Sequence, residues 1–144
     1  MNKSHLTAIT RRSVSAPVRY IANNFDCSGK VLDYGCGKGF DVDYFGFDKY
    51  DPYFFPDEVK PGYDIIICNY VFNVIKQDEQ QELLITLKSL LNKNGTCFIT
   101  VRRDVIKEGY TSRGTYQTNA VLDLPVFYEN KNHFIIYIWV DKII

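Results

Sequence analysis

An acid and three alternating glycines form the first group of residues that could do chemistry. Asp33 lies in the stretch 31–34, and Gly35, Gly37 and Gly39 follow it. Alternate glycines let the backbone turn sharply and let a ligand contact the main chain, and a helix that begins after the turn directs free N–H groups at that ligand. A carboxylate at position 33 suits a cationic group, such as an amine or a sulfonium, better than a diphosphate. The pattern favours a nucleotide-like ligand that carries a positive charge.

Two other glycine motifs do not fit this stretch. The dinucleotide-binding fingerprint needs a glycine where this chain has Phe40, and a P-loop ends in Gly-Lys-Ser/Thr, which is absent here. The remaining alternative is a plain strand-to-helix turn, which seldom needs three glycines and an acid.

A second acid stands where a ribose would be held. Asp51 lies 16 residues after Gly35 and directly before Pro52. An acid at the end of the strand that follows a glycine turn can accept hydrogen bonds from both ribose hydroxyls. Asp48 competes for this role, and Asp51 could also be an acid that starts a turn before proline.

Hydrophobic periodicity predicts the elements that position these residues. Helices are expected at 15–25, at 41–45 and from a capping box formed by Asp78 and Gln81 to a stop at Asn94-Gly95. Strands are expected at 31–34, 47–50, 63–68 and 96–101, before a hairpin of 126–129 and 134–140. Residues 1–14 are expected to form a basic arm or a loop over the site. This order predicts a single α/β domain over residues 1–144, with a mostly parallel sheet whose ligand lies beyond the carboxyl ends of the strands.

The glycine stretch, Val31 to Gly39, resembles motif I of class I S-adenosylmethionine-dependent methyltransferases. Asp51 resembles their ribose-binding acid, residues 63–73 their fourth strand, residues 91–101 the end of a helix and the fifth strand, and the final hairpin their antiparallel last strand. The resemblance implies a Rossmann-like fold and S-adenosylmethionine as cofactor. It implies that the amino-acid end of the cofactor binds Asp33 and the backbone of Gly35, Gly37 and Gly39. Asp51 would hold the ribose, and Pro52 and Tyr53 would line the adenosine. The sulfonium would lie beside Asn69 and Tyr70, which are therefore the catalytic candidates.

A narrower resemblance covers four segments, 12–20, 50–56, 69–74 and 108–117. They are similar to methyltransferases associated with DNA phosphorothioation. This narrower match implies no particular substrate.

The chain also departs from the methyltransferase pattern. Only 13 positions separate Asp51 from Asp64, an interval that usually contains a further helix and the third strand. The third strand is therefore expected to be missing, and the acid that often holds the adenine amino group has no counterpart. The lost adenine contact predicts weaker affinity for the cofactor or help from a partner subunit. The missing strand also leaves a sheet edge exposed, which favours a homodimer.

Cations and aromatic residues alternate after the last parallel strand. The expected acceptor-binding residues are Arg11, Arg102, Tyr110, Arg113, Tyr116 and Gln117. Arginine binds phosphate and tyrosine stacks on bases, so the set favours DNA, RNA or a nucleotide. An ordinary solvated loop is the alternative. The run that starts at Asn69 lacks the prolines of amino-methylating DNA enzymes, and Cys68 lacks the proline that precedes the nucleophile of cytosine C5 enzymes, so a buried strand thiol is expected there.

Bulk properties limit the remaining function classes. The net charge is +0, the four cysteines have no metal-ligand spacing, and no apolar run is long enough to cross a bilayer. The sequence thus predicts a cytoplasmic protein without a metal. Its expected function is methyl transfer to a nucleic acid or nucleotide-like acceptor. The alternatives are a degenerate partner or regulatory subunit without activity, and a small-molecule methyltransferase whose pocket is lined by the aromatic residues 53–55.

Overall fold

The computed structural model describes residues 4–8 and 11–141. In chain order its elements are η1 (Ser4–Thr7), α1 (Ala16–Asn24), β1 (Val31–Tyr34), α2 (Phe40–Phe45), β2 (Asp48–Tyr50), β3 (Tyr63–Asn69), η2 (Phe72–Val74), α3 (Gln77–Leu90), β4 (Leu91–Arg102), β5 (Gly109–Tyr110), β6 (Tyr116–Gln117), β7 (Val126–Asn130) and β8 (Phe134–Val140).

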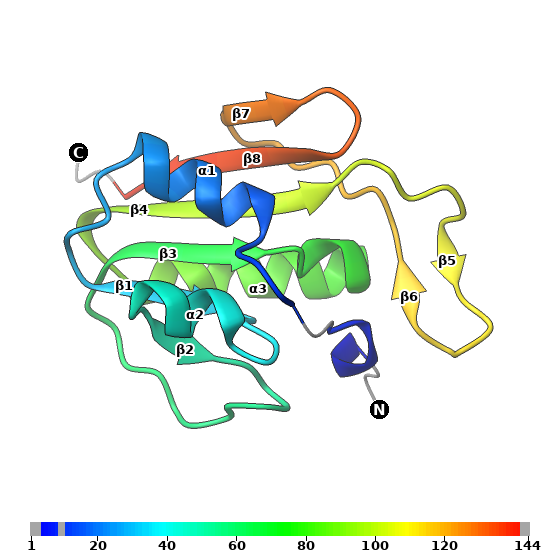
Figure 1. Ribbon diagram of the computed structural model, residues 1–144, viewed down its shortest axis with the longest axis horizontal. Coiled ribbons are helices and arrows are strands. Elements are labelled where there is room, and N and C mark those ends of the chain that lie inside the picture. Colours follow the sequence, from blue (N-terminus) through cyan, green and yellow to red (C-terminus); the bar gives the residue numbers. More distant parts are fainter. Residues whose placement is uncertain (1–3, 9–10, 142–144) are drawn as a thin grey trace.

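One sheet of six strands forms the centre of the molecule (Figure 1). Its order is β2-β1-β3-β4-β8-β7; the first four strands are parallel, β8 runs antiparallel to β4, and β7 runs antiparallel to β8. The expected α/β fold with a mostly parallel sheet and an antiparallel C-terminal hairpin is confirmed.

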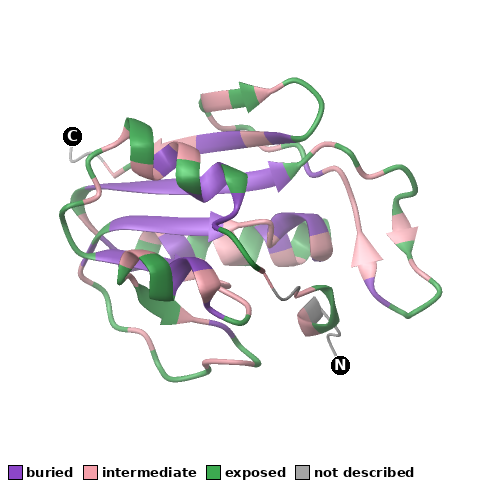
Figure 2. Cartoon of the chain, viewed as in Figure 1, coloured by how far each residue is buried: buried purple, intermediate pink, exposed green. Residues whose placement is uncertain are grey.

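Helices cover both faces of the sheet, α1 and α2 on one side and α3 on the other (Figure 1). Alternate side chains of β3 serve the two layers, because successive residues of a strand point to opposite faces. Ile65 and Ile67 pack with the α1 layer, and Ile66 and Cys68 pack with the α3 layer. The central strands are therefore buried on both faces (Figure 2), which explains the continuous apolar run of β3.

The middle of the fold is abbreviated, as the sequence predicts. Residues 51–62, all of which are described, contain no strand beyond an isolated bridge between Asp51 and Phe55. The short strand β2 is therefore the edge of the sheet beside β1. The third strand expected of a longer methyltransferase sheet is missing here.

The expected ends of the helix α3 are wrong. The helix begins at Gln77, after Lys76, whose N–H donates to Glu79 Oε1 at 3.2 Å. The capping box expected at Asp78 and Gln81 does not form because both residues already lie within the first turns.

The expected helix stop at Asn94-Gly95 lies inside β4 instead. The helix ends four residues earlier at Leu90, and Leu91 already pairs with Tyr63 of β3. Asn94 has a φ of 63° and donates its N–H to the carbonyl oxygen of Asp141 at 2.7 Å. Sheet pairing has replaced the last helical turn, and the Asn-Gly pair lies within β4 between Leu91 and Thr96, where the pairing with β3 shifts register.

Candidate active site

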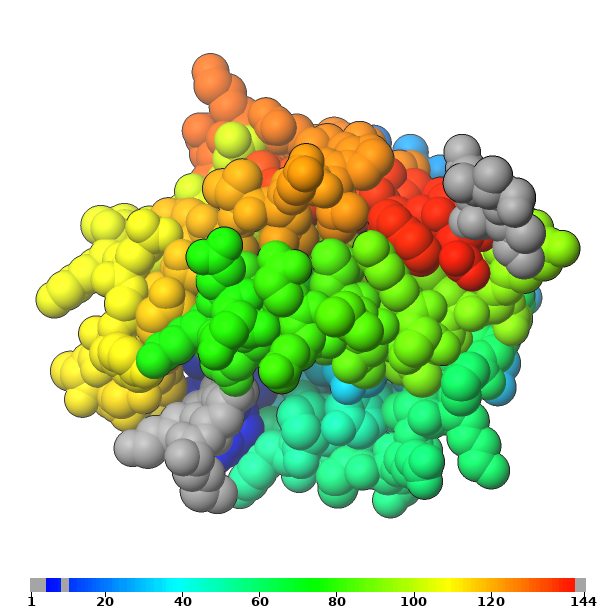
Figure 3. All heavy atoms as spheres, turned by 180° about the vertical axis from the view of Figure 1, so that it is seen from behind, coloured from blue at the N-terminus to red at the C-terminus, as the bar shows by residue number. Residues whose placement is uncertain are grey.

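A cavity of about 870 Å³ opens at the carboxyl ends of β1, β3 and β4. Its walls come from the glycine turn, the segment after β2, the segment after β3, the N-terminal segment and the β6 region. Seen from behind, the N-terminal segment (blue) lies between the yellow β5–β6 region and the teal segment after β2 (Figure 3). The lining residues that matter below are His5, Ala8, Arg11, Asp33, Gly35, Gly37, Gly39, Asp41, Asp51, Pro52, Tyr53, Asn69, Tyr70, Val71, Asn73, Arg102, Tyr116 and Gln117.

The glycine turn is held open for a ligand by its backbone conformation. Gly35 and Gly39 have φ values of 86° and 88°, which only glycine adopts without strain. A Cβ on Gly35 would also collide with Val71 Cγ2. The N–H groups of Gly35 and Cys36 both donate to the carbonyl oxygen of Tyr50, at 2.7 and 3.0 Å, so the end of β2 fixes the position of the turn.

Asp33 is a buried acid with one carboxyl oxygen that no described residue satisfies. Its side chain is only 2% exposed, and its Oδ1 accepts no hydrogen bond from any described residue. Burial, together with the negative charges of Asp41 and Asp51, raises the pKa of Asp33 to about 8, while Arg11 acts in the opposite direction. An orphaned acid costs free energy unless a donor or a cation meets it. This carboxylate therefore fits a cationic ligand group in the cavity.

Asp51 binds the turn as well as facing the cavity. Its Oδ2 accepts from the N–H of Gly37 at 2.9 Å, and its Oδ1 accepts from the N–H groups of Tyr53 at 2.9 Å and Phe54 at 3.1 Å. The turn-starting role before Pro52 is thus present. The cavity-facing position that a ribose-binding acid needs is present too, and Pro52 and Tyr53 line the same wall.

Asn69 and Tyr70 lie at the end of β3, in a chain of hydrogen bonds. The hydroxyl of Thr100 donates to Asn69 Oδ1, the Asn69 amide donates to Ser15 Oγ at 3.0 Å, and that hydroxyl donates to Asp41 Oδ2 at 2.7 Å. Tyr70 has a φ of 61°, and burial raises the pKa of its hydroxyl to about 12. Asn69 therefore ties β3 and β4 to the start of α1, while Tyr70 presents a neutral phenol.

Asn73 is a site residue that was not expected. It is 2% exposed; its amide donates to the carbonyl oxygens of Arg102 at 3.0 Å and Thr118 at 2.7 Å, and its Oδ1 accepts from the N–H of Arg102 at 2.6 Å. It thereby clamps the segment after β4 against the cavity. A polar residue within the apolar run 71–75 is the only sequence signal for this role.

The expected acceptor-binding residues fall into two groups. Arg11, Arg102, Tyr116 and Gln117 line the cavity, whereas Tyr110 and Arg113 do not. Arg102 pairs with Asp104, Nε to Oδ1 at 2.8 Å. Tyr110 is 60% exposed on the β5–β6 hairpin, and Arg113 is exposed in the same hairpin. Only four of the six expected acceptor-binding residues therefore line the cavity.

Residues 4–8 and 11–141 contain no group of three or more acids, histidines or cysteines that could hold a metal ion. Within the same ranges, no helix is long and apolar enough to cross a membrane.

The comparison with known families gives the decisive observation. A model of the methyltransferase domain matches residues 6–134, which is most of the chain. The chain belongs to this methyltransferase family. The match is to the general domain, so the narrower resemblance to phosphorothioation-associated enzymes stays a prediction.

Solved structures show the same fold at low sequence identity. TehB from Haemophilus influenzae is 16% identical with a TM-score of 0.61, and the alignment covers 92% of this chain but 63% of TehB. A TehB-like SAM-dependent methyltransferase from Corynebacterium glutamicum is 16% identical with a TM-score of 0.56, covering 90% and 89% of the two chains. Magnesium protoporphyrin IX methyltransferase from Synechocystis is 14% identical with a TM-score of 0.52, covering 87% and 76%. No curated protein matches the methyltransferase chain by sequence.

Proposed function

We propose that this methyltransferase uses S-adenosylmethionine and transfers its methyl group to a nucleic acid or nucleotide-like acceptor. The observation that carries the cofactor assignment is the buried acid Asp33, whose Oδ1 has no hydrogen-bond partner among the described residues and which lines the same cavity as the glycine turn. The structures of related fold that are named for SAM support it.

The described residues fit the cofactor group by group. Asp33 would bind the ammonium of the amino-acid end, and the open backbone of Gly35 and Gly37 would pack against it. Asp51 would accept hydrogen bonds from the ribose, with Pro52 and Tyr53 beside the adenosine. When bound, S-adenosylmethionine supplies a methyl group already activated by its sulfonium.

Transfer from such a donor needs alignment more than proton chemistry, because holding two reactants in line supplies much of the rate. We assign this task to Asn69 and Tyr70, and their position in the lining of the cavity, together with the glycine turn and Arg102, supports the assignment. Hydrogen bonds to Thr100 and Ser15 hold the side-chain amide of Asn69 in one orientation at the cavity wall. The neutral phenol of Tyr70 shapes the wall of the site and adds no charge.

The nucleic-acid or nucleotide class rests on the residues that reach the cavity. Arg11, Arg102 and Tyr116 combine positive charge with an aromatic ring in one lining, a combination typical of sites that bind phosphates and bases. The narrower phosphorothioation-associated type remains a hypothesis within this proposal. The free thiols of all four cysteines support the cytoplasmic location expected from the sequence.

Two measurements test this proposal. Isothermal titration of the folded protein with S-adenosylhomocysteine tests the cofactor half, and an absence of binding at millimolar ligand would refute it. Transfer of a radiolabelled methyl group to separate DNA, RNA and small-molecule fractions tests the acceptor half. Label in either nucleic-acid fraction, or on nucleotides of the small-molecule fraction, supports the proposed class.

A small-molecule acceptor is the second candidate. The cavity is walled on one side by the N-terminal segment and on another by the β6 region, and such enclosure suits a compact ligand. Label that enters only non-nucleotide compounds would favour it. Binding of S-adenosylhomocysteine without transfer to any fraction, together with a stable complex with another protein, would favour the partner-subunit alternative.

A further inference from the structure

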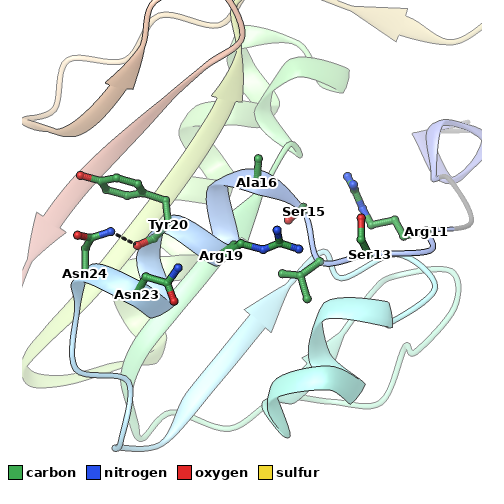
Figure 4. Close-up of a pocket in the computed structure, with 9 residues that line it drawn as sticks. Arg11, Ser13, Ser15, Ala16, Arg19, Tyr20, Asn23 and Asn24 are labelled. Carbon is green, nitrogen blue, oxygen red and sulfur yellow. Dashed lines mark hydrogen bonds between the residues drawn. The ribbon is translucent and has the colours of Figure 1, made fainter.

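A second, smaller cavity lies beside the first, along the helix α1. Its volume is about 480 Å³, and it is lined by Arg11, Ser13, Val14, Ser15, Ala16, Arg19, Tyr20, Asn23 and Asn24 (Figure 4). Arg11 and the segment 13–15 come from the chain before the helix, while the other residues come from the helix itself. Arg11 lines both cavities. The two cavities are therefore neighbours with a shared wall.

Two arginines, Arg11 and Arg19, line this groove. Figure 4 shows Arg11 and Arg19 on opposite sides of the segment that carries Ser13 and Ser15, and the guanidinium of Arg19 points toward that segment. Among the described residues, neither takes part in an ion pair, and the sequence from 11 to 25 contains no acid. Two like charges facing one groove are unfavourable unless an anion lies between them.

Among the described residues, the neighbouring acids form no ion pair with the two arginines. The charge of Arg11 acts on Asp33, and the Asp41 carboxylate accepts from the N–H of Ser15 at 3.0 Å and from the hydroxyl of Ser15 at 2.7 Å. The guanidinium groups thus keep their donors for a ligand. Guanidinium groups bind phosphate oxygens through paired N–H donors, which makes phosphate the anion that fits best.

We propose that the Arg11–Arg19 groove binds a phosphate group of the methyl acceptor. This inference rests on the proposed function and narrows it to acceptors that carry a phosphate ester. The cofactor has no phosphate, so the groove serves the other substrate. Ser15 borders the groove and accepts a hydrogen bond from Asn69, at the wall of the main cavity. A phosphate held here lets the remainder of the acceptor pass Arg11 and enter the site beside Asn69.

The test measures binding of phosphate-bearing probes to the full chain. Fluorescence anisotropy follows a labelled oligothymidylate of about ten nucleotides, within the range of common single-strand site sizes. Thymidine 5′-monophosphate and thymidine serve as competitors. The variant Arg19→Gln removes one charge from the groove, and Arg12→Gln is the matched control because Arg12 is exposed and lines neither cavity.

We expect Arg19→Gln to weaken oligothymidylate binding about tenfold, and to reduce the slope of log K against log salt by about 0.7, the value for one lost phosphate contact on a single strand. Arg12→Gln should leave that slope unchanged. Competition by thymidine 5′-monophosphate but not by thymidine would identify a free nucleotide phosphate as sufficient. Arg19-dependent binding of the oligonucleotide alone would identify a strand phosphate.

Three results would overturn the inference: equal losses in Arg12→Gln and Arg19→Gln, displacement of the oligonucleotide by thymidine as effectively as by its monophosphate, or no binding of either phosphate probe. Titration of Arg19→Gln with S-adenosylhomocysteine keeps this failure distinct from a failure of the cofactor proposal. Arg19 does not line the main cavity, so its substitution should leave that affinity unchanged.

Discussion

Cofactor binding should release a proton, and that proton should come from Asp33. Its pKa is raised to about 8, chiefly by burial, so the carboxyl group of the ligand-free protein is mostly protonated at pH 7. An ammonium group can pair with it only after the proton leaves. The expected release at pH 7 is about 0.9 proton per ligand bound, from a pKa near 8 in the free protein and a much lower one in the complex.

The same shift sets the pH dependence of affinity. Between pH 6 and pH 8 the charged fraction of Asp33 rises from about 1% to about 50% for a pKa of about 8. The affinity for S-adenosylhomocysteine should therefore increase about fifty-fold over this interval, or about 2.3 kcal/mol. Binding improves as the pH rises, because the competent form is the deprotonated one.

Titration calorimetry in buffers of low and high ionisation enthalpy, such as phosphate and Tris, gives the proton count directly. 5′-Methylthioadenosine, which lacks the amino-acid end, is the control ligand and should bind without proton release. Asp33→Asn should abolish both the release and most of the affinity for S-adenosylhomocysteine. Proton release that persists in Asp33→Asn, or wild-type binding that is independent of pH and buffer, would refute this reasoning.

Three further predictions concern the turn, the ribose and the clamp. Gly35→Ala should prevent binding of S-adenosylhomocysteine, because the new Cβ would combine a strained φ of 86° with a clash against Val71. Gly46→Ala is the control: its φ is 73° but no atom lies near its Cβ, so it should only lower stability by about 1–3 kcal/mol in thermal melts. Equal binding by both variants would contradict a ligand-binding role of the glycine turn. Asp51→Asn should weaken the binding of 5′-methylthioadenosine about tenfold, and a larger effect of Asp48→Asn would move the ribose to that acid instead. Asn73→Ala should lower the free energy of unfolding by about 2–4 kcal/mol, because three partly buried hydrogen bonds are lost. It should also speed limited proteolysis of the segment 103–119, and unchanged proteolysis would mean that other contacts hold that segment.

The sequence predicts the sheet well because local signals and the global fold agree there. The apolar run of β3, the glycines after β1 and the short interval between Asp51 and Asp64 each depend on nearby residues. The ends of α3 could not be predicted in the same way. Leu91 leaves the helix to pair with Tyr63, a contact 28 positions away along the chain, and such tertiary contacts override a capping pattern.

The site was predictable in its acids and glycines but not in its supporting contacts. The sequence indicates Asp33 and Asp51 because they precede and follow the glycine turn at the spacing expected of ligand-binding acids. The clamp by Asn73 and the chain from Thr100 through Asn69 to Ser15 join residues from separate elements. No spacing rule connects them, so only the folded chain shows that they act together.

The stacking of His5 on Tyr53 has a consequence for the speed of ligand exchange. Their ring centroids are 3.9 Å apart and their planes differ by 12°, and both residues line the main cavity. A stacked pair adds about 0.5–1.5 kcal/mol, so loss of this contact alone shifts an opening equilibrium by roughly 2- to 13-fold. The stacked pair thus holds η1 only weakly against Tyr53 at the wall of the main cavity. A ligand that passes between η1 and Tyr53 would therefore meet only a small energetic barrier from this contact.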